Sequence, residues 1–581
     1  HREEGDGGRE TKTTDRERGS KNMESRRSQP SPQSKTEETA TATTRRPEQQ
    51  LQHSPFMHPP APSDDPDAVD NPPWTFSEAI DRVGLGPFQM RLVTMCGMGW
   101  VVDSMEVLVL AFALEAIATS FELSSVGKGL IGSASFFGML VGAGFWSIYA
   151  DKRGRRTAFV SSLACVFVGG VSSALSPSFY VLCLCRVLVG FGVGGNLPVT
   201  TALVTEFVPT NDRSNVLCAT AGTFWGIGMI SASLLGLILA NVLGSGKEEA
   251  MWRWFLGVAA LPSAIVAVAY RLLPESPRFL QVMGRHDEAI QVLEHVARMN
   301  GKLDVLGLDF SGQSVGEGDN LRLRMAGSSD LDSGGIGDAS AHGQGAENAE
   351  AGDVRELFHT PILRRITLSL WVVWFTVNIS YFGVTFLLPR YYDKISGGQA
   401  DFVYILSACV GATFIPGAFA AMWLCSEHRL GRVGALKWSS YAAAAAVILL
   451  ATTLRVNALF GLASILTLFV TTIPVTVKYV LTPELYSTKY RAVGLGSSSV
   501  VTRLGGLLAP VLAEVLYDGW GPVAPLLVFG PIMIITGIAA GMIPVETAGR
   551  QLDDDSWDRK EPAKTTFSCR NIELSTTPTG V

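Results

Sequence analysis

Residues 178–206 read SFYVLCLCRVLVGFGVGGNLPVTTALVTE, a run in which Arg186 is the only charged residue before Glu206 at its end. A helix of about 20 mostly apolar residues is long enough to cross a bilayer. Similar runs recur along the chain and predict twelve spans. We expect them at 89–118, 127–150, 156–176, 178–206, 216–243 and 252–273, and at 362–390, 401–425, 434–454, 456–482, 493–517 and 521–543.

Charge is segregated along the 581 residues, of which 47% are apolar and 17% charged. This pattern excludes an ordinary soluble multidomain protein and indicates a multi-pass integral membrane protein. The expected organisation is a disordered cytoplasmic tail (1–85), a six-helix bundle (86–273), a cytoplasmic central loop (274–360), a second six-helix bundle (361–543) and a cytoplasmic tail (544–581).

Basic residues favour one side of the predicted bundle, because Lys and Arg gather in the loops after spans 2, 4, 6 and 8. By the positive-inside rule, both termini and the central loop are expected to be cytoplasmic. Amphipathic helical segments are expected near 74–88 and 280–300, and a flexible linker at 311–352. Either the plasma membrane or the membrane of an intracellular vesicle or organelle fits this pattern.

Three motifs recur in the same order in the two halves. DKRGRR (151–156) is echoed by EHRLGR (427–432), and PESPR (274–278) by PVETAGR (544–550). Glu206 with Arg213 is echoed by Glu484 with Arg491. The offsets agree within a few residues, which indicates a duplicated six-helix unit. Parallel repeats with a site between them are the architecture of secondary transporters.

These motifs resemble the major facilitator superfamily: D-x-x-G-R-R after span 2, R-x-x-x-G-x-G in span 4 and PESPR after span 6. The strings WVVDSME (100–106), PELY (483–486), RAVGLG (491–496) and RLGG (503–506) resemble the synaptic-vesicle-glycoprotein-2-related transporters, a branch near the organic ion and nicotinate carriers. The resemblance implies an all-α membrane protein with two pseudo-symmetric bundles. Span 7 lacks the paired glutamines of sugar porters, which disfavours a hexose substrate.

The resemblance also implies that charged loop residues latch the bundle in an outward-open state. In the first half, Glu206 would contact Asp151, Arg155 and Arg156. In the second half, Glu484 would form an ion pair with Arg429 or Arg432. His428 stands where the family places an Asp, so the second latch is expected to be weaker. The whole predicted set is Asp151, Gly154, Arg155, Arg156, Glu206, Arg213, Glu275, Arg278, Arg429, Arg432, Glu484 and Arg491.

Asp103, Glu106 and Arg503 fall well inside predicted spans, where each ionised group costs about 2.5–3.5 kcal/mol on insertion. Asp103 and Glu106 share a face of span 1, and two nearby carboxylates resist ionising together. They are predicted to carry a coupling proton; the alternative is a structural pair bonded to a neighbouring helix. Arg503 in span 11 stays charged, so it is expected to bind a substrate carboxylate or to form a permanent salt bridge with Asp103 or Glu106. The two are compatible if substrate and acid compete for the same guanidinium.

Other residues inside the spans are candidates for the wall of a binding site. Trp100, Trp225, Trp374, Asn378 and Tyr381 would supply aromatic surface and polar groups for a flat ligand, or would simply pack. Lys478, nearer the end of span 10, is expected to extend its ammonium group to the membrane surface.

The function predicted is secondary active transport of a small organic ion by alternating access, coupled to a proton, with an organic or aromatic acid anion favoured by Arg503. Two alternatives remain: an organic cation or carnitine carrier, and a vesicle receptor or trafficking protein that does not transport. No P-loop, zinc-protease motif or nucleophile elbow occurs, and the eight Cys form no C-x-x-C pair. No enzyme activity, cofactor, metal or nucleic acid is therefore expected, and the protein is expected to be a monomer.

Overall fold

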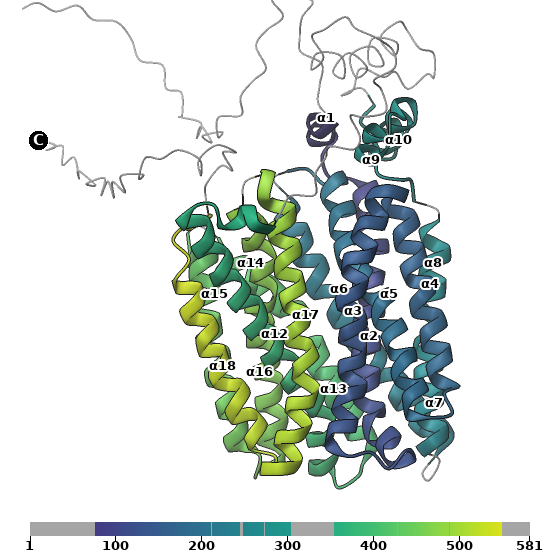
Figure 1. Cartoon of the computed structure of the whole chain (residues 1–581), viewed down its shortest axis with the longest axis vertical. Coiled ribbons are helices and arrows are strands. Elements are labelled where there is room, and N and C mark those ends of the chain that lie inside the picture. Colours follow the sequence, from purple (N-terminus) through teal and green to yellow (C-terminus); the bar gives the residue numbers. More distant parts are fainter. Residues whose placement is uncertain are drawn as a thin grey trace, which may run out of the picture. The chain divides into compact units, whose positions relative to one another are not determined.

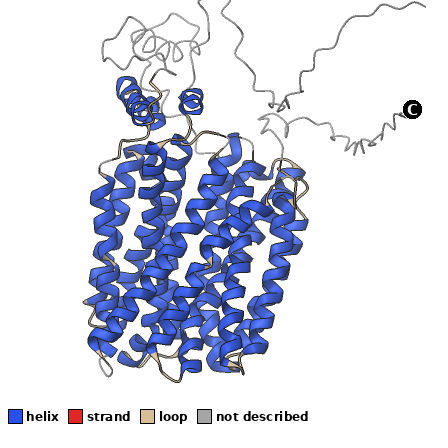
Figure 2. Cartoon of the chain, turned by 180° about the vertical axis from the view of Figure 1, so that it is seen from behind, coloured by secondary structure: helices blue, strands red, loops and turns tan. Residues whose placement is uncertain are grey.

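The computed structural model describes residues 76–210, 212–244, 248–271, 273–303, 354–426, 428–486 and 488–548, which are helical apart from short connections (Figure 2). They belong to one compact unit within Asn71–Val581. Glu427 of the second loop motif, the predicted linker at 311–352 and the tail beyond 548 lie outside these described residues.

The first half is formed by helices that match the predicted spans within a few residues (Figure 1). They are α2 (Pro87–Ser120), α3 (Ser125–Arg153), α4 (Arg155–Ala174), α5 (Phe179–Phe207), α6 (Arg213–Leu243), and α7 (Glu248–Ala259) with α8 (Leu261–Tyr270). The sequence places caps at the expected points, since Ser124 and Ser178 accept bonds from the backbone at the starts of α3 and α5.

The second half repeats the pattern. Its helices are α12 (Pro361–Ser396), α13 (Ala400–Ala412) with α14 (Phe414–Leu424), α15 (Gly431–Thr453), α16 (Asn457–Leu485), α17 (Thr488–Trp520) and α18 (Ala524–Gly541). Thr360 caps α12 by accepting from the Leu363 N–H. The predicted twelve-span, all-α fold is therefore confirmed.

Eleven helical segments of the described chain are long and apolar enough to cross a membrane. The twelfth span is α2, whose 34 residues include Asp103 and Glu106 and pack against α6 and α7. Its length and its place in the bundle are those of a span. The chain thus buries two carboxylates, Asp103 and Glu106, in a helix that is long enough to cross the membrane.

Short helices lie at one end of the bundle, which we call the α10 end (Figure 1). They are α1 (Phe76–Val83), α9 (Pro277–Val282), α10 (His286–Met299) and the 3-10 helix η3 (Val354–Phe358). α10 buries Ala289, Ile290, Leu293 and Val296, the face that its sequence pattern predicts. Asn300 fixes α10 to the bundle by accepting from the Phe88 N–H at 3.1 Å.

Close helix crossings inside the first half depend on glycine. A Cβ at Gly138 in α3 would collide with the Val187 carbonyl of α5, and one at Gly190 would collide with the Ser135 carbonyl. The two backbones therefore approach more closely than any side chain would allow. This contact holds α5 against α3, the helix that also packs on α17 of the second half.

Candidate functional site

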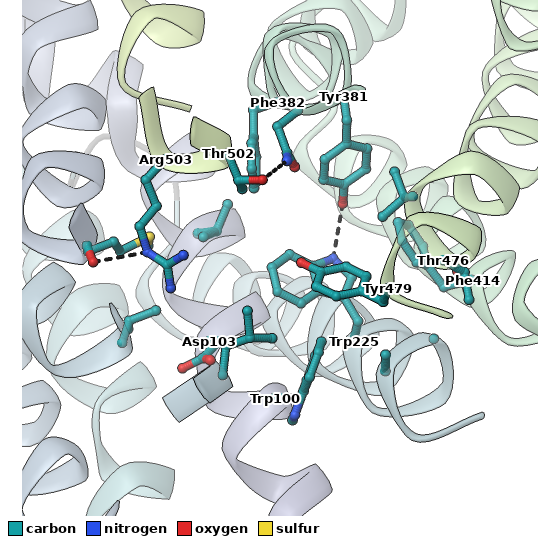
Figure 3. A pocket seen from close by; sticks show the side chains of 18 of the residues that line it. Trp100, Asp103, Trp225, Tyr381, Phe382, Phe414, Thr476, Tyr479, Thr502 and Arg503 are labelled. Carbon is teal, nitrogen blue, oxygen red and sulfur yellow. Dashed lines mark hydrogen bonds between the residues drawn. The ribbon is translucent and has the colours of Figure 1, made fainter. Parts of the chain in front are cut away.

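A cavity of about 110 Å³ lies where the two halves meet. Its lining comes from α2, α3, α5 and α6 of the first half and from α12, α14, α16 and α17 of the second. Most of the lining is apolar or aromatic, and Asp103 and Arg503 are its two charged members. Figure 3 shows these two side chains on the same side of the cavity, opposite Tyr381.

Arg503 is held by neutral acceptors and is only 6% exposed. Its Nε donates to the Met139 carbonyl at 3.0 Å and its Nη2 to the Gly194 carbonyl at 3.2 Å, both in the first half. Its Nη1 donates to the carbonyl and the hydroxyl of Ser499 at 2.9 and 2.5 Å. The guanidinium forms no ion pair within the described residues, so the permanent salt bridge considered as the alternative is not formed.

Asp103 is held from within its own half. Its Oδ1 accepts from Asn196 Nδ2 at 2.6 Å, and the Asn196 side-chain oxygen accepts from Ser162 at 2.8 Å. Asn196 follows the Gly194–Gly195 pair in α5, where the close α3–α5 contact fixes the backbone. The carboxylate is therefore oriented by a neutral amide and lines the cavity.

Glu106 has different surroundings, although it is on the same helix face as Asp103. It pairs with Arg186 of α5 at 3.1 Å, and both side chains are almost fully buried. Arg186 also donates to Ser173 at 2.9 Å. Glu106 does not line the cavity. Arg186 is the arginine of the span-4 motif R-x-x-x-G-x-G, and nothing in that motif indicates Glu106 as its partner.

The predicted wall residues divide into two groups. Trp100, Trp225, Asn378 and Tyr381 line the cavity, whereas Trp374 does not. Trp374 is fully buried behind Tyr479, with ring centroids 4.8 Å apart, and donates to Thr482. A direct contact between Trp374 and a ligand is therefore not what this structure shows.

Two hydrogen bonds join residues of the cavity wall. Trp225 of α6 donates to the Tyr381 hydroxyl of α12 at 3.0 Å, which joins the halves across the cavity (Figure 3). Asn378 donates to Thr502 at 2.9 Å and so presents its amide beside Arg503. The cavity therefore offers polar groups on one side and aromatic rings on the other.

Lys478 does not extend to the surface, so that prediction is wrong. Its side chain is fully buried, and its Nζ has no hydrogen-bond partner within the described residues. The Nζ lies 4.6 Å from the Trp374 ring centroid and 5.2 Å from that of Tyr479. Aromatic faces attract a cation, so these two rings are favourable neighbours for the ammonium group.

The loop motifs of both halves adopt matching geometry at the α10 end. Gly154 and Gly431 have φ values of +99° and +69°, a conformation that favours glycine. Glu275 accepts from the Arg156 N–H at 3.1 Å, and Glu546 accepts from the Arg432 N–H at 2.7 Å. We call each such Gly–Glu contact a loop clamp.

Ion pairs extend both clamps. Arg155 contacts Asp151 at 2.5 Å and Glu206 at 3.6 Å, and Arg432 pairs with Glu484. Arg429, the other candidate partner of Glu484, instead lies over the Trp423 ring. These pairs join elements of one half. The sequence repeat thus has a counterpart in three dimensions.

The remaining predicted latch residues approach one another from both halves. Arg213 and Arg491 each donate to a backbone carbonyl of their own half, those of Val208 and Pro483. Burial lowers the pKa of the Arg213 guanidinium, the carboxylates of Asp81 and Glu206 raise it, and the positive charges of Arg278 and Arg491 lower it further. Arg213 and Arg491 therefore bring like charges from the two halves near each other at the α10 end.

The opposite end carries an ionic network that the sequence did not predict. Arg390 of α12 contacts Glu115 at 2.8 Å and Glu514 and Asp518 at 2.7 Å each. Lys128 contacts Glu115 at 2.8 Å, and Ser125 donates to Asp518 at 2.5 Å. Because Glu115, Lys128 and Ser125 belong to the first half, this network ties the halves together.

Two six-helix halves around a central cavity, with clamps at one end and an inter-half network at the other, are the architecture of a membrane transporter. The chain belongs to the major facilitator superfamily, whose model matches residues 95–480. It carries small molecules across a membrane, as that superfamily does.

Similar proteins fall in the predicted branch. The chain is 32% identical to organic cation/carnitine transporter 7 of Arabidopsis thaliana, over 85% of this chain and 98% of that protein. It is 28% identical to the synaptic vesicle 2-related protein of Rattus norvegicus, over 82% of each chain. It is 27% identical to the niacin transporter NiaP of Acinetobacter baylyi, over 82% of this chain and 98% of that protein.

The fold is also that of solved transporters. The xylose transporter XylE from E. coli, in a partially occluded inward-open conformation, matches with a TM-score of 0.60 at 13% identity, over 79% of this chain and all of that chain. At this identity the likeness concerns the fold alone.

Proposed function

We propose that the chain is a secondary active carrier that moves a small organic anion by alternating access, with a proton as the coupling ion. The observation that carries this proposal is the state of Arg503 in the cavity. Its guanidinium is buried and bonded to neutral carbonyls and a hydroxyl, so its charge is not neutralised by an ion pair. A carboxylate entering the cavity would gain a strong charge-assisted partner there.

Asp103 supports the proton part of the proposal. It lines the same cavity from the other half, and in its ionised form it would compete with a substrate anion for the field of Arg503. A proton on Asp103 would remove that competition, so substrate and proton would load together. Glu106 would act further back through its pair with Arg186, whose rearrangement would shift α2 against α5.

The two ends of the bundle suggest how access would alternate. The network around Arg390 holds one end together, while like charges from the two halves lie near each other at the α10 end. With the basic α10 end in the cytoplasm, this arrangement favours opening toward that side. The loop clamps keep each half rigid while the halves rock against each other.

The test is uptake by the purified full chain in proteoliposomes, with an imposed proton gradient. Labelled nicotinate is compared with labelled carnitine and tetraethylammonium. We expect nicotinate uptake to need the gradient and Arg503→Gln to lower it by about a hundredfold, the loss expected for one charge-assisted contact of about 3 kcal/mol. Arg503→Lys keeps the charge and should retain part of the uptake.

Two results would overturn the proposal: nicotinate uptake that Arg503→Gln leaves unchanged, and uptake of carnitine or tetraethylammonium in the absence of any uptake of anions. Because Arg503 also bonds across the halves, the thermal unfolding of each variant is measured beside its uptake. A folded Arg503→Gln protein that no longer transports separates the binding role from a structural one.

An organic cation is the second candidate substrate. Asp103 supplies a carboxylate and Trp100, Trp225 and Tyr381 supply aromatic faces, which together suit a quaternary ammonium group. One relative is named as an organic cation/carnitine transporter. In this case Asp103→Asn would abolish carnitine uptake, while Arg503→Gln would leave it intact or raise it.

A further inference from the structure

A second cavity, of about 700 Å³, lies at the α10 end between α4 and the α8–α10 segment. Figure 1 shows α9 and α10 beyond the ends of α4 and α8. Four arginines, Arg153, Arg156, Arg271 and Arg285, line this cavity with two glutamates, Glu275 and Glu288. It is separate from the central cavity and shares no lining residue with it.

The charge in this cavity is positive and incompletely compensated. Glu288 pairs with Arg285 at 2.6 Å, and Glu275 is occupied by backbone N–H groups, including that of Arg156. Arg153 and Arg271 are exposed, and neither side chain has an ion pair within the described residues. Two guanidinium groups are thus available to an anion at this site.

The cavity opens where the lipid-facing surface of the bundle ends. On α8, Ile265 and Val268 are 68% and 66% exposed, and Arg271 follows Val268 by three residues on the same helix face. On α4, Val168 is also exposed, and Val160 of the same helix lines the cavity. Both helices belong to candidate membrane spans. The guanidinium groups therefore lie at the depth at which lipid headgroups begin.

Exposed apolar residues beside the cavity fit the same position. Val282 and Met283, at the end of α9, are 76% and 44% exposed. A short helix that turns such residues outward at the end of a bundle is suited to the membrane interface. The cavity floor is itself apolar, with Phe279 and Leu280 buried beneath the arginines.

We infer that this cavity binds the phosphorylated headgroup of an anionic phospholipid, with the acyl chains along the exposed stripes of α4 and α8. The planar guanidinium group of arginine can donate two parallel hydrogen bonds to phosphate oxygens. Basic pockets at the edge of a helical bundle are suited to bind such headgroups. The site adjoins the first loop clamp, because Arg156 and Glu275 belong to both. A bound lipid would therefore stabilise the turn between α3 and α4.

The test uses the full chain in phosphatidylcholine nanodiscs and a fluorescent phosphatidylinositol 4-phosphate, with energy transfer from the protein tryptophans as the signal. Arg153→Gln and Arg271→Gln should each weaken binding about fivefold, the usual effect of one basic residue at a membrane surface. Arg298→Gln, on the exposed part of α10 and outside the cavity, is the matched control and should bind like the unmodified protein.

Two further arms identify the source of the phosphate. Fluorescent phosphatidylinositol without the extra phosphate should bind more weakly, and soluble inositol 1,4-bisphosphate should compete poorly because it lacks acyl chains. The inference is overturned if the double variant Arg153→Gln/Arg271→Gln binds the lipid as well as the Arg298→Gln control does. It is also overturned if the soluble compound binds as tightly as the lipid, since the site would then serve a free phosphate ester.

Discussion

The buried charged residues of this transporter differ in how each charge is stabilised. Glu106 has Arg186, Asp103 has a neutral amide, Arg503 has carbonyls, and Lys478 has aromatic faces. These differences lead to distinct expectations for substitution, because removing one partner of a buried ion pair leaves the other without compensation.

The Glu106–Arg186 pair should behave as a unit. Arg186→Gln leaves a buried carboxylate unpaired and should lower the free energy of unfolding by about 3–5 kcal/mol. The double variant Glu106→Gln/Arg186→Gln removes both charges and should recover much of that loss. Thermal unfolding in detergent measures the cycle. Losses that simply add in the double variant would show that the two residues do not interact.

Lys478 is expected to lower the free energy of unfolding. Lys478→Met keeps most of the side-chain volume and removes a buried, unbonded ammonium, so we expect the variant to gain about 1–3 kcal/mol in unfolding free energy. Lys478→Ala is the control, because it removes the charge but also leaves a cavity beside Trp374. A lower melting temperature for Lys478→Met than for the unmodified protein would contradict the expectation.

Sequence patterns located these charges but not their partners. Each span was predictable because a run of apolar residues reflects the bilayer directly. Asp103 and Glu106 share spacing and helix face, yet their surroundings differ because Arg186 is 80 residues away from Glu106 along the chain. A single helix pattern carries no information about which neighbour faces it. The same limit led to the wrong expectation for Lys478 and to the placement of Trp374 among the ligand contacts.

At the scale of elements, the sequence repeat predicts the loop clamps better than it predicts any other contact between helices. Both motifs contain a glycine with positive φ, and both bring a glutamate onto the following N–H groups. The network around Arg390 had no comparable signal, because its members come from four helices and recur in no motif.

A glycine substitution can separate backbone strain from loss of the clamp. Gly431→Ala should cost more than Gly397→Ala, since both positions have positive φ but only Gly431 has a glutamate, Glu546, against the site of a new Cβ. The strain alone is worth about 1–2 kcal/mol. Thermal unfolding of the two variants gives the comparison. Equal losses would mean that the Glu546 contact contributes nothing to the turn.

At the scale of the whole molecule, the balance between the two ends should set which side is open. Arg390→Ala removes the residue that joins three carboxylates from both halves, so the end opposite α10 should separate more often. We expect about a fivefold change in the ratio of the two states, as for the loss of roughly 1 kcal/mol in a partly exposed network.

Spin labels can report this change as a distance between Thr119→Cys and Gln399→Cys, two exposed positions at that end in different halves. Pulsed electron spin resonance should show a larger population of long distances in Arg390→Ala. Arg455→Ala, an exposed arginine in the short loop between α15 and α16, is the control. An unchanged distance distribution in Arg390→Ala would show that the network does not hold that end.

The contacts of Arg503 have one more consequence, for how this protein tolerates mutation. Its acceptors in the first half are main-chain carbonyls, those of Met139 and Gly194. Every amino acid supplies such a carbonyl, so a side-chain change at Met139 that still fits keeps the acceptor. A side-chain substitution can therefore remove the donor, Arg503, but not the main-chain acceptors of this contact between the halves. A saturation mutagenesis scan should find Arg503 intolerant and Met139 permissive, although the two residues are in direct contact.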